Sequence, residues 1–215
     1  MVATDYDTWV LDLDGTLVDV EESYVHDVLG AVGDRIGHEF SEREAETLWH
    51  GLGGSRNAQL REWGVDVDAF WAAFHDVEDA RTRAEHTFLY DDASVVADVD
   101  APVALVTHCQ QYLTDPVLDH LDIRDWFDAV VCCTPETGWK PDPAPVETAL
   151  DDASASGAGV LVGDSPHDIG AAWNAGLDGV HVERHSHERR GHCVRGDYRV
   201  RSLEALRPGA TTGSD

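Results

Sequence analysis

Lysine is almost absent from this chain of 215 residues: Lys140 is the only lysine among its 15 basic residues, and the others are arginine. The sequence also lacks any run of 18 apolar residues and any basic segment near its N-terminus. We therefore expect neither a membrane span nor a secretory signal. Its four cysteines form no CxxC pair, and two of them are adjacent in an apolar run, which fits packed cysteines in a reducing cytoplasm.

Acidic residues far outnumber basic ones, 42 against 15, which gives a formal net charge of −27. Such a field repels nucleic acids and anionic membranes, so neither is an expected partner. The chain should also repel itself at low salt, whereas molar salt shortens the Debye length to about 3 Å and removes that repulsion. Abundant aspartate with one lysine is typical of the salt-rich cytoplasm of an extreme halophile. The alternative, an acidic protein with a basic partner, is less favoured because the acids are spread along the whole chain.

Short apolar runs alternate with helical patterns in most of the chain. Strands are predicted at residues 8–11, 103–106, 129–132, 160–162 and 179–182, and helices at 111–122, 143–153 and 167–176. The alternation predicts an α/β fold, a Rossmann-like parallel sheet with helices on both faces. The 42% hydrophobic content supplies enough apolar side chains for its core.

Residues 17–87 interrupt this alternation with helical patterns at 23–36, 41–49, 55–62 and 67–82 and no convincing strand. Ser41 followed by Glu44 is a capping-box pattern. A helical block inserted after the first strand predicts a cap over the end of that strand. We expect a core domain of residues 1–16 and 88–207, a helical cap of 17–87 and a loose tail of 208–215.

Reactive side chains follow the predicted strands at the ends where such folds bind ligands. Asp12 and Asp14 follow the first strand, Thr107 ends the second, and Lys140 lies beyond the third. Asp164 follows the fourth strand and Asp168 comes four residues later. We expect this set to converge on one edge of the sheet.

The set suits phosphate chemistry. Asp12 and Asp14, two residues apart, can point to one side, so that one carboxylate attacks while the other moves protons. Gly15 allows a sharp turn whose amides can approach an anion. Clustered aspartates suit Mg²⁺, and Lys140 and Thr107 suit phosphate oxygens. A metal is required, because the carboxylates alone would repel a phosphate.

Four segments resemble motifs I to IV of the haloacid dehalogenase (HAD) superfamily, in the expected order. They are Asp-Leu-Asp-Gly-Thr-Leu-Val-Asp (12–19), Val-Thr (106–107), Trp-Lys-Pro-Asp-Pro (139–143) and Gly-Asp-Ser-Pro-His-Asp (163–168). The resemblance spans roughly residues 12 to 182 and implies a Rossmann-like core and phosphoryl transfer through a phospho-aspartate. The place of the helical insertion resembles the C1 cap of the phosphoglycolate phosphatase-like branch.

The resemblance also implies a role for each matching residue. Asp12 would be the nucleophile, and Asp14 would protonate the leaving group and then activate water. Asp12, the Asp14 carbonyl and Asp164 would hold Mg²⁺, with Asp168 a ligand through water or an orienter of Lys140. Thr107 and Lys140 would bind the phosphoryl oxygens. The expected function is a Mg²⁺-dependent phosphatase acting on a small phosphorylated metabolite.

Two other functions stay open: a β-phosphoglucomutase-like phosphomutase, and a non-catalytic binding protein on the same fold. The complete residue set argues against the binding protein, which has no use for a nucleophile and its proton donor. Phosphonate-cleaving relatives need a cap lysine, which this chain lacks, and true dehalogenases lack the aspartate at position 14. The physiological substrate and the oligomeric state are not encoded in any readable motif.

Weaker patterns give three further hypotheses. His108 follows Thr107 and is a candidate for the phosphate site or for contact with the leaving group, although it could face solvent. Arg56 ends a glycine-rich loop and is a candidate for binding a substrate carboxylate or second phosphate, the alternative being a surface arginine at a helix start. Potential zinc ligands crowd one stretch, but their spacing is not standard and arginines between them oppose a cation, so a solvated loop is favoured. These residues are His181, His185, His187, His192 and Cys193.

Overall fold

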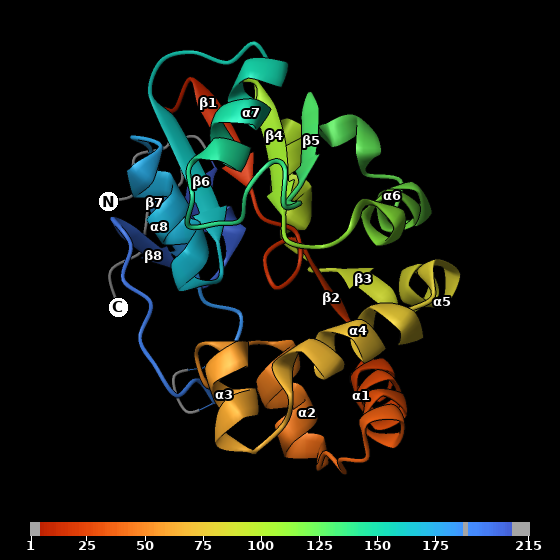
Figure 1. Ribbon diagram of the computed structural model, residues 1–215. Coiled ribbons are helices and arrows are strands. Elements are labelled where there is room, and N and C mark those ends of the chain that lie inside the picture. Colours follow the sequence, from red (N-terminus) through yellow and green to blue (C-terminus); the bar gives the residue numbers. More distant parts are fainter. Residues whose placement is uncertain (1–4, 187–188, 208–215) are drawn as a thin grey trace. The chain divides into compact units, whose positions relative to one another are not determined.

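The structure is a computed structural model that describes residues 5–186 and 189–207 (Figure 1). It divides into two compact units. The core unit comprises Met1–Asp19, Leu89–Arg184 and Val194–Asp215, and the helical unit comprises Val20–Phe88 and His185–Cys193. The helical unit thus takes up a second segment besides the one expected at 17–87, and the predicted tail of 208–215 lies outside the described residues.

The core unit contains the predicted parallel sheet, whose six strands lie in the order β5-β4-β1-β6-β7-β8. Their bounds are β1 Thr8–Leu11, β4 Val103–Thr107, β5 Ala129–Cys132, β6 Gly159–Gly163, β7 Asp178–Val182 and β8 Tyr198–Val200. Five of them stand where the apolar runs predicted strands. The sixth, β8, was missed because it has only three residues and includes the charged Arg199.

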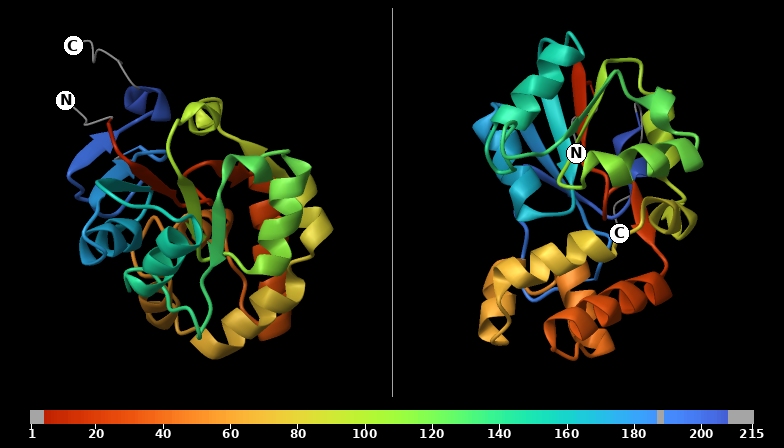
Figure 2. Two further views of the ribbon diagram at one scale, coloured as in Figure 1. Left: turned by 90° about the horizontal axis from the view of Figure 1, so that it is seen from above. Right: turned by 45° about the vertical axis from the view of Figure 1, so that its right-hand side comes forward.

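Helices cover both faces of the sheet, as predicted (Figure 2). Alternate residues of each strand serve opposite faces, so Trp9 and Leu11 join one buried cluster and Val10 the other. The first face packs against α6 (Gln111–His120) and the short 3-10 helices η1 (Ala93–Asp98) and η3 (Leu203–Leu206). The second packs against α7 (Ala144–Asp152) and α8 (Pro166–Asn174). A further 3-10 turn, η2, spans Arg124–Trp126.

The side on which the chain adds strands to the sheet changes between β1 and β6. After β1 the chain adds β4 and β5 on one side, then returns to add β6, β7 and β8 on the other. In open α/β sheets the crevice beyond the carboxyl ends of the strands at such a switch point binds ligands. The residues that follow β1 and β6 are therefore the first place to look for a site.

The helical unit contains five helices. They are α1 (Glu22–Ile36), α2 (Glu42–Trp49), α3 (Arg56–Glu62), α4 (Val67–Val77) and α5 (Ala80–Glu85). Of these, α1 to α4 contribute to an apolar cluster of the unit's own. The capping box predicted from Ser41 and Glu44 is present: the Ser41 hydroxyl accepts from the Glu44 amide at 3.3 Å, and Glu44 accepts from the Ser41 amide at 2.9 Å. Local sequence signals therefore set where α2 begins.

Residues 17–87 differ from prediction in two ways. The single helix expected over 67–82 is two helices, because Asp79 accepts a hydrogen bond from the Thr82 amide at 2.9 Å and starts α5. No strand was expected there, yet β2 (Val18–Val20) and β3 (Thr87–Leu89) pair at the two ends of the segment. This ladder contains two of the points at which the chain passes from one unit to the other.

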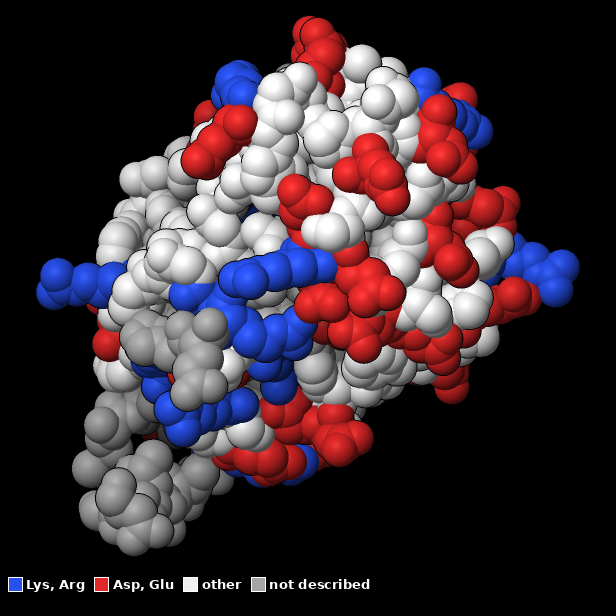
Figure 3. Space-filling model, turned by 90° about the horizontal axis from the view of Figure 1, so that it is seen from below, with Lys and Arg blue, Asp and Glu red and all other residues white. Residues whose placement is uncertain are grey.

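Acidic side chains lie in several groups on the face drawn in Figure 3, whereas lysine and arginine side chains gather mainly in one patch. The spread of acidic groups agrees with their even distribution along the sequence. Among the helices that the structure describes, none is long and apolar enough to cross a bilayer.

Candidate active site

Asp12 and Lys140 form a buried ion pair at the switch point of the sheet. The Lys140 ammonium lies 2.6 Å from Asp12 Oδ1 and 2.6 Å from Asp168 Oδ1, and it donates to the Val106 carbonyl at 2.8 Å. Lys140 is only 4% exposed. One compact cation thus connects two carboxylates and a strand end, which a planar guanidinium could not do in the same space.

Burial and the charge of the partner shift the pKa values of Asp12 and Lys140 in opposite directions. Burial raises the pKa of Asp12 and Lys140 opposes it, while Asp168 and Asp14 add to the rise, so the pKa of Asp12 lies at about 7. Burial would lower the pKa of Lys140, but Asp12 and Asp168 outweigh burial and raise it. Lys140 therefore stays charged at neutral pH, where Asp12 is close to its titration range.

Asp168 is held by the first turn of α8. Its Oδ2 accepts hydrogen bonds from the Ser165 amide at 2.9 Å and the Ser165 hydroxyl at 2.6 Å. Burial would raise the pKa of Asp168, but Lys140 and Ser165 together lower it. Gly163 is required here, because a Cβ at that position would lie 2.3 Å from atoms of Asp168. Asp168 is thus a fixed carboxylate that orients Lys140.

Three buried carboxylates form a cluster that could hold a metal ion. One oxygen each of Asp12, Asp164 and Asp168 lie within 4.8 Å of one another. Gly15 has a φ of +78°, and a Cβ on it would approach the Asp164 carboxyl to 2.9 Å, so only glycine fits. Hard oxygen ligands in this arrangement fit Mg²⁺. The Asp14 ligand expected from the resemblance is a backbone carbonyl, so that side chain need not join the cluster.

The remaining predicted core residues lie on the same strand ends. Thr107 is buried at the end of β4, where its hydroxyl accepts from the Cys109 amide at 3.0 Å. Asp14 is half-buried in the turn after β1. The ring of His108, next to Thr107, contacts the ring of Trp139 with a centroid separation of 5.5 Å. None of these contacts defines a phosphate position for His108.

Arg184 supports the loop after β1, a role that no sequence pattern predicts. Its guanidinium donates to the Thr16 carbonyl at 2.6 Å and pairs with both oxygens of Asp92 at 2.8 Å. The Thr16 hydroxyl in turn donates to Asp12 Oδ2 at 3.3 Å. The guanidinium also lies 4.0 Å from the centre of the Tyr90 ring. No motif marks Arg184, which follows β7 and reaches this loop only through the fold.

His181 is a second supporting residue. It is fully buried in β7, and its Nε2 lies 3.1 Å from the backbone oxygen of Asp164. This contact places the ring beside the turn that carries a predicted metal ligand. His181 was considered as a zinc ligand, but it lies in the core unit whereas His185, His192 and Cys193 belong to the helical unit. His187 lies outside the described residues.

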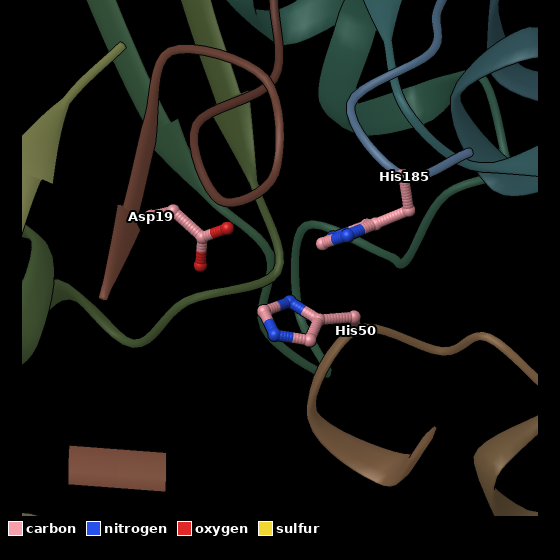
Figure 4. Close-up of side chains that lie close together, drawn as sticks. All are labelled: Asp19, His50 and His185. Atoms are coloured by element: carbon pink, nitrogen blue, oxygen red, sulfur yellow. The ribbon is translucent and has the colours of Figure 1, made fainter. Parts of the chain in front are cut away.

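Within the helical unit, the segment His185–Cys193 packs against the residues around the end of α2. Figure 4 shows the imidazole rings of His50 and His185 close together, and their centroids are 4.3 Å apart. Arg189 pairs with Glu46 at 2.5 Å, and the Gly191 amide donates to the Leu52 carbonyl at 2.7 Å. The described residues of this segment, 185–186 and 189–193, thus form a largely exposed loop that a few contacts anchor within the helical unit.

Burial and neighbouring arginines set the charge of His50, which contacts that segment. Burial, then Arg189 and Arg56, lower the pKa of His50 to about 4. The His50 imidazole is therefore uncharged at neutral pH. Asp19, also drawn in Figure 4, belongs to the core unit, where it accepts a hydrogen bond from the Tyr90 hydroxyl at 2.7 Å.

Arg56 has a structural contact in the helical unit. Its guanidinium donates to the carbonyl oxygens of Leu48 and Trp49, each at 2.6 Å. These are among the last carbonyls of α2, which have no partner inside the helix. A contact between Arg56 and a substrate stays a prediction.

Comparison with known proteins agrees with this geometry. Residues 9–182 match the family model of haloacid dehalogenase-like hydrolases. The chain is 26% identical over 185 residues to fructose-1-phosphate phosphatase YqaB of Escherichia coli, covering 80% of this chain and 94% of that protein. It is 29% identical over 183 residues to a phosphoglycolate phosphatase of Yersinia pseudotuberculosis, covering 77% and 75%. A pyrophosphatase PpaX of Bacillus velezensis is 26% identical, covering 78% of each chain.

Solved structures share the fold across nearly the whole chain. A haloacid dehalogenase-like family protein of Streptococcus pneumoniae superposes with a TM-score of 0.74 at 18% identity, covering 95% of this chain and 98% of that one. A HAD-superfamily hydrolase of Geobacter sulfurreducens gives a TM-score of 0.66 at 16% identity, covering 94% of each. With the family model matching most of its length, the chain belongs to the haloacid dehalogenase-like hydrolases.

Proposed function

We propose that this protein hydrolyses a small phosphate monoester through a phospho-aspartate formed on Asp12. The observation that carries the proposal is the buried Asp12 carboxylate at the switch point, with Lys140 at 2.6 Å and the Thr16 hydroxyl at 3.3 Å. A carboxylate held in this way by a cation has one defined direction of attack. A structural ion pair would not need the second aspartate, Asp14, in the adjoining turn.

Two displacements at phosphorus complete the reaction. First, an Asp12 oxygen bonds to phosphorus while the bond to the ester oxygen breaks, and Asp14 gives its proton to the leaving oxygen. Next, Asp14 takes a proton from water, whose oxygen bonds to phosphorus and releases Asp12 and phosphate. Lys140 balances negative charge on the transferred group, and the Thr107 hydroxyl is placed to donate to its oxygens.

Mg²⁺ fits the cluster of Asp12, Asp164 and Asp168, with the Asp14 carbonyl as a further ligand. When bound, it supplies positive charge that offsets the carboxylates and the phosphate. Asp168 also orients Lys140 through their 2.6 Å contact. Without a divalent cation, the buried carboxylates repel the phosphate group, so we propose a strict metal requirement.

The helical insertion and the amino-acid composition indicate the kind of cap and the cellular environment. We propose that the helical unit is a cap of the C1 type and that the protein works in a salt-rich cytoplasm, which its charge of −27 favours. The relatives named above act on fructose 1-phosphate, phosphoglycolate and pyrophosphate. We propose that this chain likewise acts on a small phosphorylated metabolite.

Hydrolysis of 4-nitrophenyl phosphate in molar KCl tests the proposal. The wild type should turn over with Mg²⁺ and stop with EDTA, and Asp12→Asn should lower kcat by at least about 10³-fold because it removes the nucleophile. Asp151→Asn, an exposed aspartate on α7, is the matched control and should be fully active. Folded, Mg²⁺-loaded wild type without turnover would contradict a general phosphatase; conversion of β-glucose 1-phosphate would then identify a mutase.

A further inference from the structure

Three aromatic rings of the core unit lie beside the proposed phosphate site. Trp139 precedes Lys140, His108 follows Thr107, and His167 precedes Asp168. Each ring is thus the chain neighbour of a buried residue of the site. The His108 ring lies 5.5 Å from the Trp139 ring and 6.0 Å from the His167 ring, measured between centroids. Three separate strand-end loops therefore build one ring cluster.

The three rings are more exposed than the site residues next to them in the chain. Lys140 is 4% exposed and Asp168 is 1% exposed, whereas Trp139 is 43% exposed. His167 is exposed and His108 is half-buried. The reactive groups are thus enclosed, and the ring cluster forms a rim beside them. An indole left partly in water beside a ligand site can bury its remaining apolar surface against a ligand.

Trp139 and Trp173 are similarly exposed but differ in their contacts. Trp173, similarly exposed at 49%, donates from its indole nitrogen to Asp197 at 2.7 Å, a contact that fixes its orientation. Trp139 instead meets His108 edge to face, which orients the indole through a second ring of the rim. The chain therefore offers two tryptophans of similar exposure, of which only Trp139 adjoins the phosphate site.

The side chains of the rim favour one kind of leaving group. None of the three rim residues is lysine or arginine, so the rim offers no fixed positive charge to a second phosphate or to a carboxylate on the leaving group. Imidazoles can donate to or accept from hydroxyl groups, and an indole face suits the apolar face of a ring. The rim thus matches a ring that carries hydroxyl groups.

We propose that the rim of Trp139, His108 and His167 binds the leaving group of the substrate, and that this group is a neutral, hydroxylated ring of the sugar class. This inference rests on the proposed phosphatase function and specifies its substrate. Trp139 stacks on the ring while the phosphate lies at Asp12 and Lys140. The rim then determines specificity without taking part in bond breaking.

Fructose 1-phosphate and glycerol 1-phosphate test the inference, because they carry the same charge and differ in the ring. Trp139→Ala should lower kcat/KM for fructose 1-phosphate by about tenfold through KM, and change the value for glycerol 1-phosphate by less than about twofold. Trp139→Phe, which keeps an aromatic face, should stay near wild type. Trp173→Ala is the matched control and should affect neither substrate.

Binding by the Asp12→Asn protein separates this inference from the proposed reaction. Calorimetry with Mg²⁺ should show tighter binding of fructose 1-phosphate than of glycerol 1-phosphate, and Trp139→Ala in this background should abolish the difference. That result supports the rim even if the wild type hydrolyses neither ester. Equal losses for both esters in Trp139→Ala, no loss for either, or tighter binding of pyrophosphate than of fructose 1-phosphate would overturn the proposal.

Discussion

In the core unit, Asp12, Lys140 and Asp168 are buried together within 2.6 Å contacts, whereas in the helical unit the buried Arg83 lies against aromatic rings. The Arg83 guanidinium is 5.1 Å from the centre of the Trp49 ring and 5.9 Å from that of Tyr24. The first arrangement holds ionised groups at strand ends beside a ligand crevice. The second stabilises a packed helical interior.

The difference lies in what surrounds each charge. Core carboxylates share one ammonium and keep oxygens in a cluster that suits a metal ion. In the helical unit, by contrast, the Arg83 guanidinium is directed at ring faces and that of Arg56 at helix carbonyls. The buried charges around Lys140 therefore suit chemistry, whereas the buried charge of Arg83 serves packing.

Replacing Lys140 should have the largest effect. Lys140→Arg keeps the charge but cannot place one nitrogen against Asp12, Asp168 and the Val106 carbonyl, so we expect kcat/KM to fall by about 10³-fold. Arg124→Lys, an equally conservative exchange at an ion pair with Asp115 and Asp119, is the control and should be nearly silent. Activity within tenfold of wild type for Lys140→Arg would show that a specific ammonium is unnecessary.

The Mg²⁺ requirement should depend on pH through Asp12. Its pKa of about 7 means that below pH 7 Asp12 carries a proton, which a metal ion must displace. The apparent affinity for Mg²⁺ should therefore weaken about tenfold for each pH unit below 7 and level off above it. Mg²⁺ titrations of activity in molar KCl at pH 6, 7 and 8 measure this. Equal affinities at pH 6 and pH 8 would contradict the assignment of Asp12 as a ligand.

Substitution of Arg184 tests whether a residue outside the four motifs affects catalysis. Arg184→Lys removes the fork that binds Thr16 and Asp92, so the Asp12 loop loses its support, and we expect kcat to fall about tenfold with KM unchanged. Thr16→Val removes the hydroxyl that reaches Asp12. If Arg184 acts through Thr16, the double variant should lose less than the two single losses combined.

Two results would count against that role. Tyr90→Phe keeps the ring beside Arg184, removes the hydroxyl that donates to Asp19, and should have little effect on kcat. A large loss there would show that this hydroxyl, rather than Arg184 alone, supports the loop. Independent, fully additive losses for Arg184→Lys and Thr16→Val would show that Arg184 only stabilises the fold.

Arg56 should give the smallest catalytic effect. Arg56→Ala leaves the carbonyls of Leu48 and Trp49 without these donors, and we expect the free energy of unfolding to fall by about 1–2 kcal/mol. Activity towards 4-nitrophenyl phosphate should change less than about twofold. Denaturant titration and initial rates on the same preparation separate the two effects. A raised KM with unchanged stability would instead assign Arg56 to the substrate.

The sheet and the strand-end residues could be predicted because backbone geometry fixes them. A buried apolar run followed by Asp12 or Asp164 places the carboxylate at one edge, whichever helices cover the sheet. β8 could not be predicted, because its three residues include charge and its place depends on pairing with β7. Likewise, the break between α4 and α5 depends on the side chain of Asp79 competing with a continuous helix.

Contacts between residues far apart in the chain could not be predicted from the sequence. Arg184 is separated from Thr16 by most of the chain, and nothing in their local patterns links them. The histidines and the cysteine of the segment His185–Cys193 are residue types that bind metals. In the structure, however, Arg189 and His185 of this segment make contacts within the helical unit. Local pattern therefore predicted the candidate nucleophile, metal ligands and lysine, while the residues that support them required the fold.

Trapping the covalent intermediate on Asp12 tests the central claim most directly. The protein would be quenched during turnover of 4-nitrophenyl phosphate with Mg²⁺ and treated with borohydride, which reduces an aspartyl phosphate to homoserine. Peptide mass spectrometry should then find homoserine at position 12 in the wild type only when substrate is present, and never in Asp12→Asn. Turnover without any modification at position 12, or with the modification at Asp14 instead, would contradict the account.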